Sequence, residues 1–246
     1  MAADSIPSGG GGPAPTAATG VDASRRTPDA LRLQILATEH WSLLASRALA
    51  WNESFARAGT FLSILSGAVV ALALVAQASK FGNGFYVFAL VILPIVLYVG
   101  ITTLLRLEAS NYHDVQCVTG MNRIRGAYLE MAPDLERYFV MSPHDDARGV
   151  GVTMVMNPNA GFVAHALAST SSVIIVLDAV LGGAIGYISG RQAGFGNALA
   201  GTTAAAGFFV VLALLGLFAR RSIATGRASL RPIFPSPQMN PDAEDL

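Results

Sequence analysis

The residue best placed to carry chemistry is Asp178, a carboxylate set in a long apolar stretch. Between residues 149 and 190 it is the only acidic or basic side chain apart from His165, which lies near one end of the third predicted span. A charged side chain at the centre of a bilayer costs about 2.5 to 3.5 kcal/mol on insertion scales, and such residues often mark proton or ion pathways. Asp178 therefore indicates either a proton- or cation-responsive site or a protonated, hydrogen-bonded carboxyl that locks helix packing.

Two hydroxyl side chains are predicted to lie at the same membrane depth as Asp178. Counted inward from the outer ends of the predicted spans, Ser66 in the first span and Tyr98 in the second fall at or beside this depth. A hydroxyl group can donate a hydrogen bond to a carboxyl oxygen. The predicted intramembrane polar site is therefore Asp178 with Ser66 and Tyr98.

Small residues at four-residue spacing predict close helix packing. Asp178 is followed at this spacing by three glycines, and a second ridge of small residues runs down the first predicted span. Such ridges let helix backbones approach closely in a membrane and allow self-association. The glycines predicted to serve in helix packing are Gly67, Gly182, Gly186 and Gly190.

Two other groups of side chains could in principle bind a metal, namely His113-Asp114 and His144-Asp145-Asp146. Neither has further ligands at a recognised metal-site spacing. Both fall in polar segments, so we interpret them as solvated charge. The sequence predicts no catalytic residues, no metal, no cofactor and no enzyme activity, and its formal net charge of +0 gives no sign of nucleic-acid binding.

The elements that position these residues are four apolar helices. The chain is 52% hydrophobic and only 13% charged, against roughly 25% charged in soluble domains. Its apolar runs are long enough to cross a hydrocarbon layer of about 30 Å as helices. The predicted spans are residues 58–78, 85–105, 164–189 and 198–219. The expected fold is all-α, an integral membrane bundle of four transmembrane helices with cytoplasmic helical extensions.

The segments between the spans complete the predicted organisation. Apolar stripes at helical spacing within residues 33–55 and 115–131 are expected to pack against each other outside the membrane. The predicted segments are a disordered tail (1–26), a cytoplasmic amphipathic helix (27–57), the first transmembrane hairpin (58–105), a cytoplasmic helical segment and loop (106–161), the second transmembrane hairpin (162–219) and a disordered tail (220–246).

Basic residues are distributed unevenly over the connecting segments. The two short turns between paired spans contain Lys80 and Arg191 alone, so 14 of the 16 basic residues lie in the other three segments. The positive-inside rule makes that side cytoplasmic. The predicted location is a bacterial plasma (inner) membrane, with both termini in the cytoplasm.

Three stretches of the chain resemble a known group of proteins. They are TEHWSLLA at 38–45, WNESFARAGTFLSILSGAVVALALVAQ at 51–77, and the cytoplasmic stretch at 120–139 with the following His-Asp-Asp. Together they resemble a group of uncharacterised bacterial multi-pass, four-helix membrane proteins with no assigned activity. The resemblance extends over about residues 36–148 and implies a membrane location and no particular chemistry.

Two functions from different classes follow from these observations. The first is a structural, sensory or scaffold role in the membrane, exerted through self-association or through a cytoplasmic protein partner. The alternative is a small oligomeric ion- or proton-linked channel or transporter that uses Asp178. The expected partners are the lipid bilayer, further copies of the chain and a cytoplasmic protein, and no nucleic acid.

Overall fold

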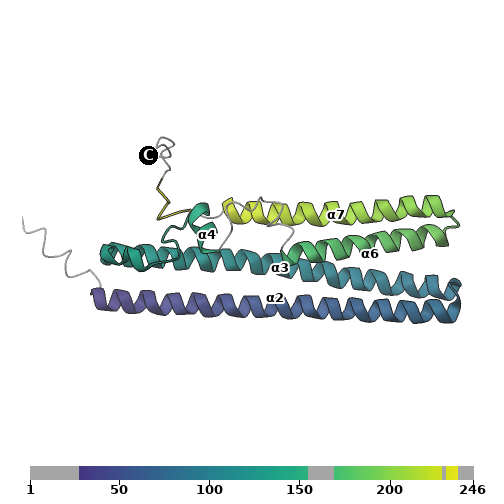
Figure 1. Cartoon of the computed structure of the whole chain (residues 1–246), viewed down its shortest axis with the longest axis horizontal. Coiled ribbons are helices and arrows are strands. Elements are labelled where there is room, and N and C mark those ends of the chain that lie inside the picture. The colour runs from purple at the N-terminus through teal and green to yellow at the C-terminus, as the bar shows by residue number, and fades with distance from the viewer. Residues whose placement is uncertain (1–27, 155–168, 229–230, 238–246) are drawn as a thin grey trace, which may run out of the picture.

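The computed structural model describes residues 28–154, 169–228 and 231–237, and this part of the chain is all-helical (Figure 1). Four of its helices are long and apolar enough to cross a membrane, as predicted. The predicted N-terminal tail, the loop around residue 160 and residues 238–246 of the predicted C-terminal tail fall outside the described residues. The elements are α2 (Asp29–Ser79), α3 (Asn83–Met131), η1 (Pro133–Tyr138, a 3-10 helix), α4 (Ala147–Thr153), α6 (Thr170–Gln192) and α7 (Asn197–Ala228).

Helices α2 and α3 are each continuous through the segments predicted to lie inside and outside the membrane. They contain 51 and 49 residues. At about 1.5 Å per residue each is about 75 Å long, more than twice the thickness of the hydrocarbon layer. Pro94 lies inside α3 without ending it. The chain reverses between the two helices at Lys80, whose left-handed backbone (φ 48°) lets the N–H of the next residue, Phe81, bond to the Ala76 carbonyl at 3.2 Å.

The four long helices are arranged as an open row rather than a closed bundle. Contacts run from α2 to α3, from α3 to α6 and from α6 to α7, with a smaller contact between α3 and α7 (Figure 1). Each outer helix therefore leaves apolar side chains uncovered, such as Leu74 on α2 (61% exposed) and Leu214 on α7 (63% exposed). The two predicted antiparallel hairpins are present, and their tips are joined by a hydrogen bond from Gln192 to Asn83.

The apolar core follows the junction of α3 with its neighbours. Its largest fully buried side chains come from three helices: Phe61 on α2, Val96 and Leu104 on α3, and Ile174 on α6. A second, smaller cluster lies beyond the predicted spans, where Val118 and Met121 of α3 contact Val150 of α4, with Leu43 of α2 alongside. The two segments predicted to pack together outside the spans thus meet at Leu43. Leu43 is not part of the predicted α2 stripe, whose members Leu44 and Trp51 are 39% and 47% exposed, and α4 covers part of the α3 stripe.

Two predicted boundaries are wrong. Residues 147–153, expected to be loop, form α4, whose N-terminus is capped by the Asp146 carboxylate accepting from the Gly149 N–H at 2.8 Å. The tail expected to be disordered from residue 220 continues α7 to Ala228, and residues 231–237 pack on the rest of the chain. Both segments are short or polar, and distant contacts stabilise them, so local periodicity could not reveal them.

Candidate functional site

Asp178 lies fully buried where α6 packs against α3, and Gly100 is directly opposite its carboxylate. A methyl group added at Gly100 would overlap the carboxylate, so the carboxylate occupies space that only a glycine leaves open. Neither Asp178 oxygen has a hydrogen-bond partner within the described part of the chain. The structure therefore places an unpartnered carboxyl group in an apolar helix interface.

The predicted partners of Asp178 are not brought to it. The Ser66 hydroxyl donates to the Leu62 carbonyl of its own helix at 2.8 Å, and the Tyr98 side chain is 67% exposed on the outside of α3. Counting residues from the membrane surface sets the depth of a side chain but not its direction around the helix. Tyr98 precedes Gly100 by two residues, which is a rotation of about 200°.

The glycine ridge of α6 forms the contact with α7. A methyl group at Gly182 would lie 2.9 Å from the carbonyl oxygen of Gly207, and one at Gly186 would overlap the backbone of Thr203. At Gly190 the nearest atom is the Thr203 hydroxyl oxygen, 2.6 Å away. Two backbones this close explain why α6 and α7 form the most extensive contact in the molecule.

Gly67 differs from the glycines of α6. No atom lies within 4 Å of a methyl group built at Gly67, and the same is true of Gly59, eight residues earlier on the same ridge. The small-residue ridge of α2 therefore faces outward from the single chain, and within the described structure it packs against no other helix.

Polar side chains join α2 to α3 just beyond the predicted spans. The nearly buried Asp114 carboxylate accepts hydrogen bonds from the Arg47 guanidinium and from the Trp51 indole N–H, the latter at 3.1 Å. One residue layer closer to the membrane, the Ser54 hydroxyl donates to Ser110 at 2.8 Å. Asp114 was interpreted as solvated charge, but the structure makes it a buried partner in the helix interface.

Glu53, whose side chain is solvent-exposed at the predicted membrane boundary, also links α2 to α3. Glu53 accepts hydrogen bonds from Arg106 of α3 at 2.9 and 3.0 Å and from Arg57 of its own helix at 2.9 Å. The hydrogen bond from Arg106, followed by that from Arg57, lowers the pKa of Glu53 to about 2. Glu53 is therefore ionised at all physiological pH values, and solvent screening keeps its contribution to stability small.

His113 lies between two potential nucleophiles. Its Nε2 atom is 3.2 Å from the Ser46 hydroxyl and 3.5 Å from the Cys117 sulfur. Burial raises the pKa of the Cys117 thiol, with the Asp114 charge adding to the effect. A raised pKa keeps the thiol protonated and therefore unreactive. This group provides no activated cysteine nucleophile.

Asp145 holds residues 231–237 against the rest of the molecule. Its fully buried carboxylate accepts from the backbone N–H groups of Ile233 (2.9 Å) and Phe234 (2.8 Å) and from the Arg123 side chain of α3 (2.7 Å). Burial by itself raises the pKa of Asp145, but the hydrogen bonds from Ile233 and Arg123 outweigh it and lower the pKa below its usual value. We call Asp145, Arg123 and residues 231–237 the C-terminal clasp.

Asp146 and Asn122 extend this network. Asp146 accepts from the Ser236 N–H at 2.9 Å and from the Ser236 hydroxyl at 2.8 Å. The Asn122 amide donates to the His144 carbonyl, while its oxygen accepts from Thr153 and Arg125. The interpretation of His144-Asp145-Asp146 as solvated charge is therefore wrong for the two aspartates. Their hydrogen-bond partners in residues 233–236 lie about 90 positions away in the sequence, so a local motif could not reveal this role.

No group of three or more metal-ligating side chains occurs within the described residues. Among the described residues, the polar features are thus the unpartnered carboxyl group of Asp178 in the predicted membrane region and two networks outside it. One network joins α2 to α3 around Asp114, and the other joins α3, α4 and residues 231–237. Comparison of the chain with family models, with curated proteins and with solved structures gives no match.

Proposed function

We propose that this chain is a membrane-anchored structural or sensory scaffold whose working part is the helical structure outside the spans. This part, which we call the projection, consists of residues 29–57 of α2, residues 106–131 of α3, η1, α4 and residues 231–237. It acts through self-association or through a cytoplasmic protein partner.

The observation that carries this proposal is the continuity of α2 and α3 between membrane and projection. Residues 29–57 and 106–131 extend about 44 and 39 Å beyond the predicted spans at 1.5 Å per residue. The contacts of Asp114 with Arg47 and Trp51 fix the two helices to each other there. Because no break separates the two parts, a partner that shifts the projection also shifts the spans.

Exposed apolar side chains on the projection support a partner. On α2, Ile35 is 56% exposed, Trp41 69% and Leu49 71%, although this region lies beyond the predicted spans. Beside η1, Tyr138 is 66% and Val140 88% exposed. Large apolar side chains exposed to water outside the spans are candidate contacts for a partner.

Photo-crosslinking in living cells tests the scaffold role. A photoreactive phenylalanine analogue in place of Leu49 is expected to give one discrete adduct, either at twice the mass of the chain or at the mass of chain plus partner. The same analogue at Glu39, an exposed polar position of α2, is the control and should give a weaker adduct. Absence of any discrete adduct from Leu49, Trp41 and Val140 would contradict the proposal.

A second function, a small oligomeric ion- or proton-linked channel or transporter, is favoured by the state of Asp178. A buried carboxyl group without a hydrogen-bond partner is costly in a membrane and is typical of a functional position. In reconstituted vesicles this function predicts proton or cation flux for the wild type and its loss in Asp178→Asn, which retains the shape of the side chain but cannot ionise. No flux in the wild type would exclude it.

A further inference from the structure

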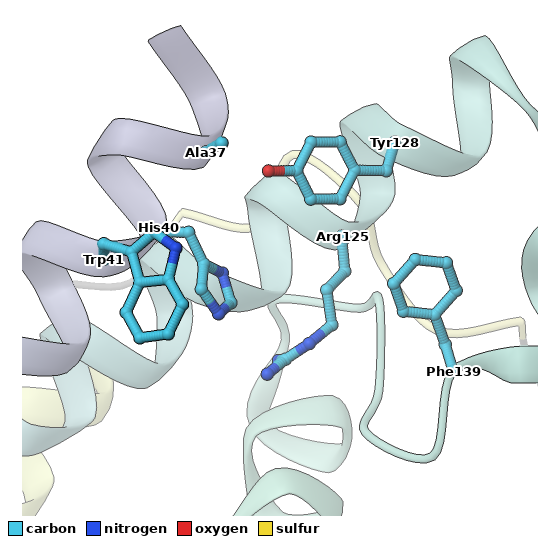
Figure 2. A pocket seen from close by; sticks show the side chains of 6 residues that line it. All are labelled: Ala37, His40, Trp41, Arg125, Tyr128 and Phe139. Carbon is cyan, nitrogen blue, oxygen red and sulfur yellow. The ribbon is translucent and has the colours of Figure 1, made fainter. Parts of the chain in front are cut away.

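The projection contains a cavity of about 250 Å³ between α2 and α3, close to residue 139. Figure 2 shows its lining: Ala37, His40 and Trp41 come from α2, Arg125 and Tyr128 from α3, and Phe139 from the segment after η1. The volume corresponds to roughly eight water molecules at ~30 Å³ each. The cavity therefore has room for a small molecule, with cationic and hydrogen-bonding groups on an otherwise apolar wall.

Arg125 differs from the other two arginines that lie half-buried in the projection. Arg47 is paired with Asp114, and Arg123 is paired with Asp145. The Arg125 guanidinium makes a hydrogen bond to the Asn122 side-chain oxygen at 2.7 Å, and no carboxylate of the described residues lies within ion-pair distance of it. A partly buried cation without an anion is unfavourable unless an external anion completes the site.

His40, on the α2 side of the cavity, carries a second unsatisfied group. Its Nδ1 atom is buried and has no hydrogen-bond partner within the described part of the chain. Burial lowers the pKa of His40, and the positive charge of Arg125 lowers it further, so the imidazole is neutral at pH 7 and can donate one N–H. Burial also raises the pKa of Tyr128, which keeps its hydroxyl protonated.

We propose that this cavity is a binding site for a small soluble anion, one that carries a phosphate or carboxylate group on a planar or apolar body. The guanidinium of Arg125 binds the anionic group in the two-point geometry that suits phosphate and carboxylate oxygens. The neutral imidazole of His40 and the hydroxyl of Tyr128 supply further donors. Trp41 and Phe139 provide apolar and aromatic surface for the body of the ligand.

The distance of the cavity from the predicted membrane boundary favours a soluble ligand over a lipid headgroup. Arg125 lies 19 residues along α3 from Arg106 at the predicted membrane boundary, which is about 28 Å along the helix axis. A headgroup at the surface cannot reach that far. Binding of a soluble anion would link α2 to α3 at the end of the projection that lies away from the membrane. The site does not depend on the proposed scaffold function.

Calorimetric titration of the full-length protein in a non-ionic detergent tests the site. Phenyl phosphate is the probe, and benzyl alcohol is its uncharged counterpart. The wild type is expected to bind phenyl phosphate and to give no comparable heat with benzyl alcohol. Arg125→Gln should weaken binding by roughly tenfold or more, because a charge-assisted hydrogen bond is lost. Arg32→Gln removes the same charge from an exposed position of α2 and should leave binding within about twofold of wild type.

Two further measurements keep the proposal falsifiable. Tyr128→Phe removes one hydroxyl group without altering the fold, and it should weaken binding of phenyl phosphate by about threefold even if Arg125→Gln does not fold. Equal binding of phenyl phosphate and benzyl alcohol by the wild type would overturn the anion site, as would equal affinities of Arg125→Gln and Arg32→Gln. Competition by anionic lipid in nanodiscs would identify a headgroup as the occupant and overturn the soluble ligand.

Discussion

Asp145→Asn is expected to release the C-terminal clasp and to lower the free energy of unfolding by about 2 to 4 kcal/mol. All described partners of the Asp145 carboxylate are donors: the N–H groups of Ile233 and Phe234 and the guanidinium of Arg123. An asparagine NH₂ group would face one of these donors and leave it unsatisfied. It would also leave Arg123 without its anion. Hydrogen exchange of residues 231–237 should accelerate, and the melting temperature should fall.

A second aspartate provides the control for this experiment. Asp134→Asn removes the same charge from an exposed position of η1 and should change neither the exchange rates of residues 231–237 nor the melting temperature. Full protection of residues 231–237 in Asp145→Asn would contradict the clasp.

The clasp should also depend on pH. The pKa of Asp145 is lower in the folded protein than its usual value of 3.8, so ionised Asp145 contributes stability above about pH 4. This contribution is lost as the pH falls below 3.8 through the lowered pKa. The protection of residues 231–237 against hydrogen exchange, measured relative to the intrinsic exchange rate at each pH, should therefore fall in that acidic range in the wild type, whereas in Asp145→Asn it should be low throughout.

Gly100→Ala is expected to disrupt the junction of α3 with α6. The added methyl group would overlap the Asp178 carboxylate, and both side chains are confined by packed helices. Overpacking of this kind costs about 1 to 3 kcal/mol. The melting temperature of the protein in detergent should fall accordingly. Adding Asp178→Ala should restore it, because removal of the carboxylate vacates the space that the methyl group needs.

The matched control is Gly67→Ala on α2, where a methyl group meets no atom within 4 Å. This substitution should not lower the melting temperature, since alanine is the better helix former. If Gly100→Ala were as stable as Gly67→Ala, or if Asp178→Ala failed to restore the double variant, Asp178 would not lie against Gly100.

The parts of the fold that could be predicted from the sequence are those set by local pattern. Uncharged runs long enough to cross a bilayer predicted four apolar helices, and the short gaps between paired runs predicted the turns at Lys80 and Arg191. The spacing of Gly182 and Gly186 on α6 predicted a close helix contact, and these glycines pack against the backbone of α7. Periodicity carries no information on which helices become neighbours, so the open row and the outward-facing Gly67 could not be predicted.

The polar sites depend on residues that are distant in the sequence. Asp145 is buried because backbone N–H groups of residues 233 and 234 surround it, and backbone donors leave no trace in residue types. The cavity beside Arg125 of α3 depends on the rotation of α2 relative to α3, which places His40 of α2 in the lining of the same cavity. Asp178 could be singled out from its residue type and its position in an apolar run. Its partners could not be predicted, because matching membrane depth pointed to the hydroxyl groups of Ser66 and Tyr98, whereas the residue opposite Asp178 is Gly100.

The most direct test of the central proposal, a projection on the cytoplasmic side of four spans, is cysteine labelling with a membrane-impermeant maleimide in a Cys117→Ser background. Gly84→Cys and Gly196→Cys lie at the hairpin tips, where an added side chain meets no atom within 4 Å. Leu49→Cys and Val140→Cys lie on exposed positions of the projection. We expect the two tip positions to be labelled in intact cells and the two projection positions to be labelled only after permeabilisation. Labelling of Val140→Cys in intact cells, or of Gly84→Cys only after permeabilisation, would contradict the proposal.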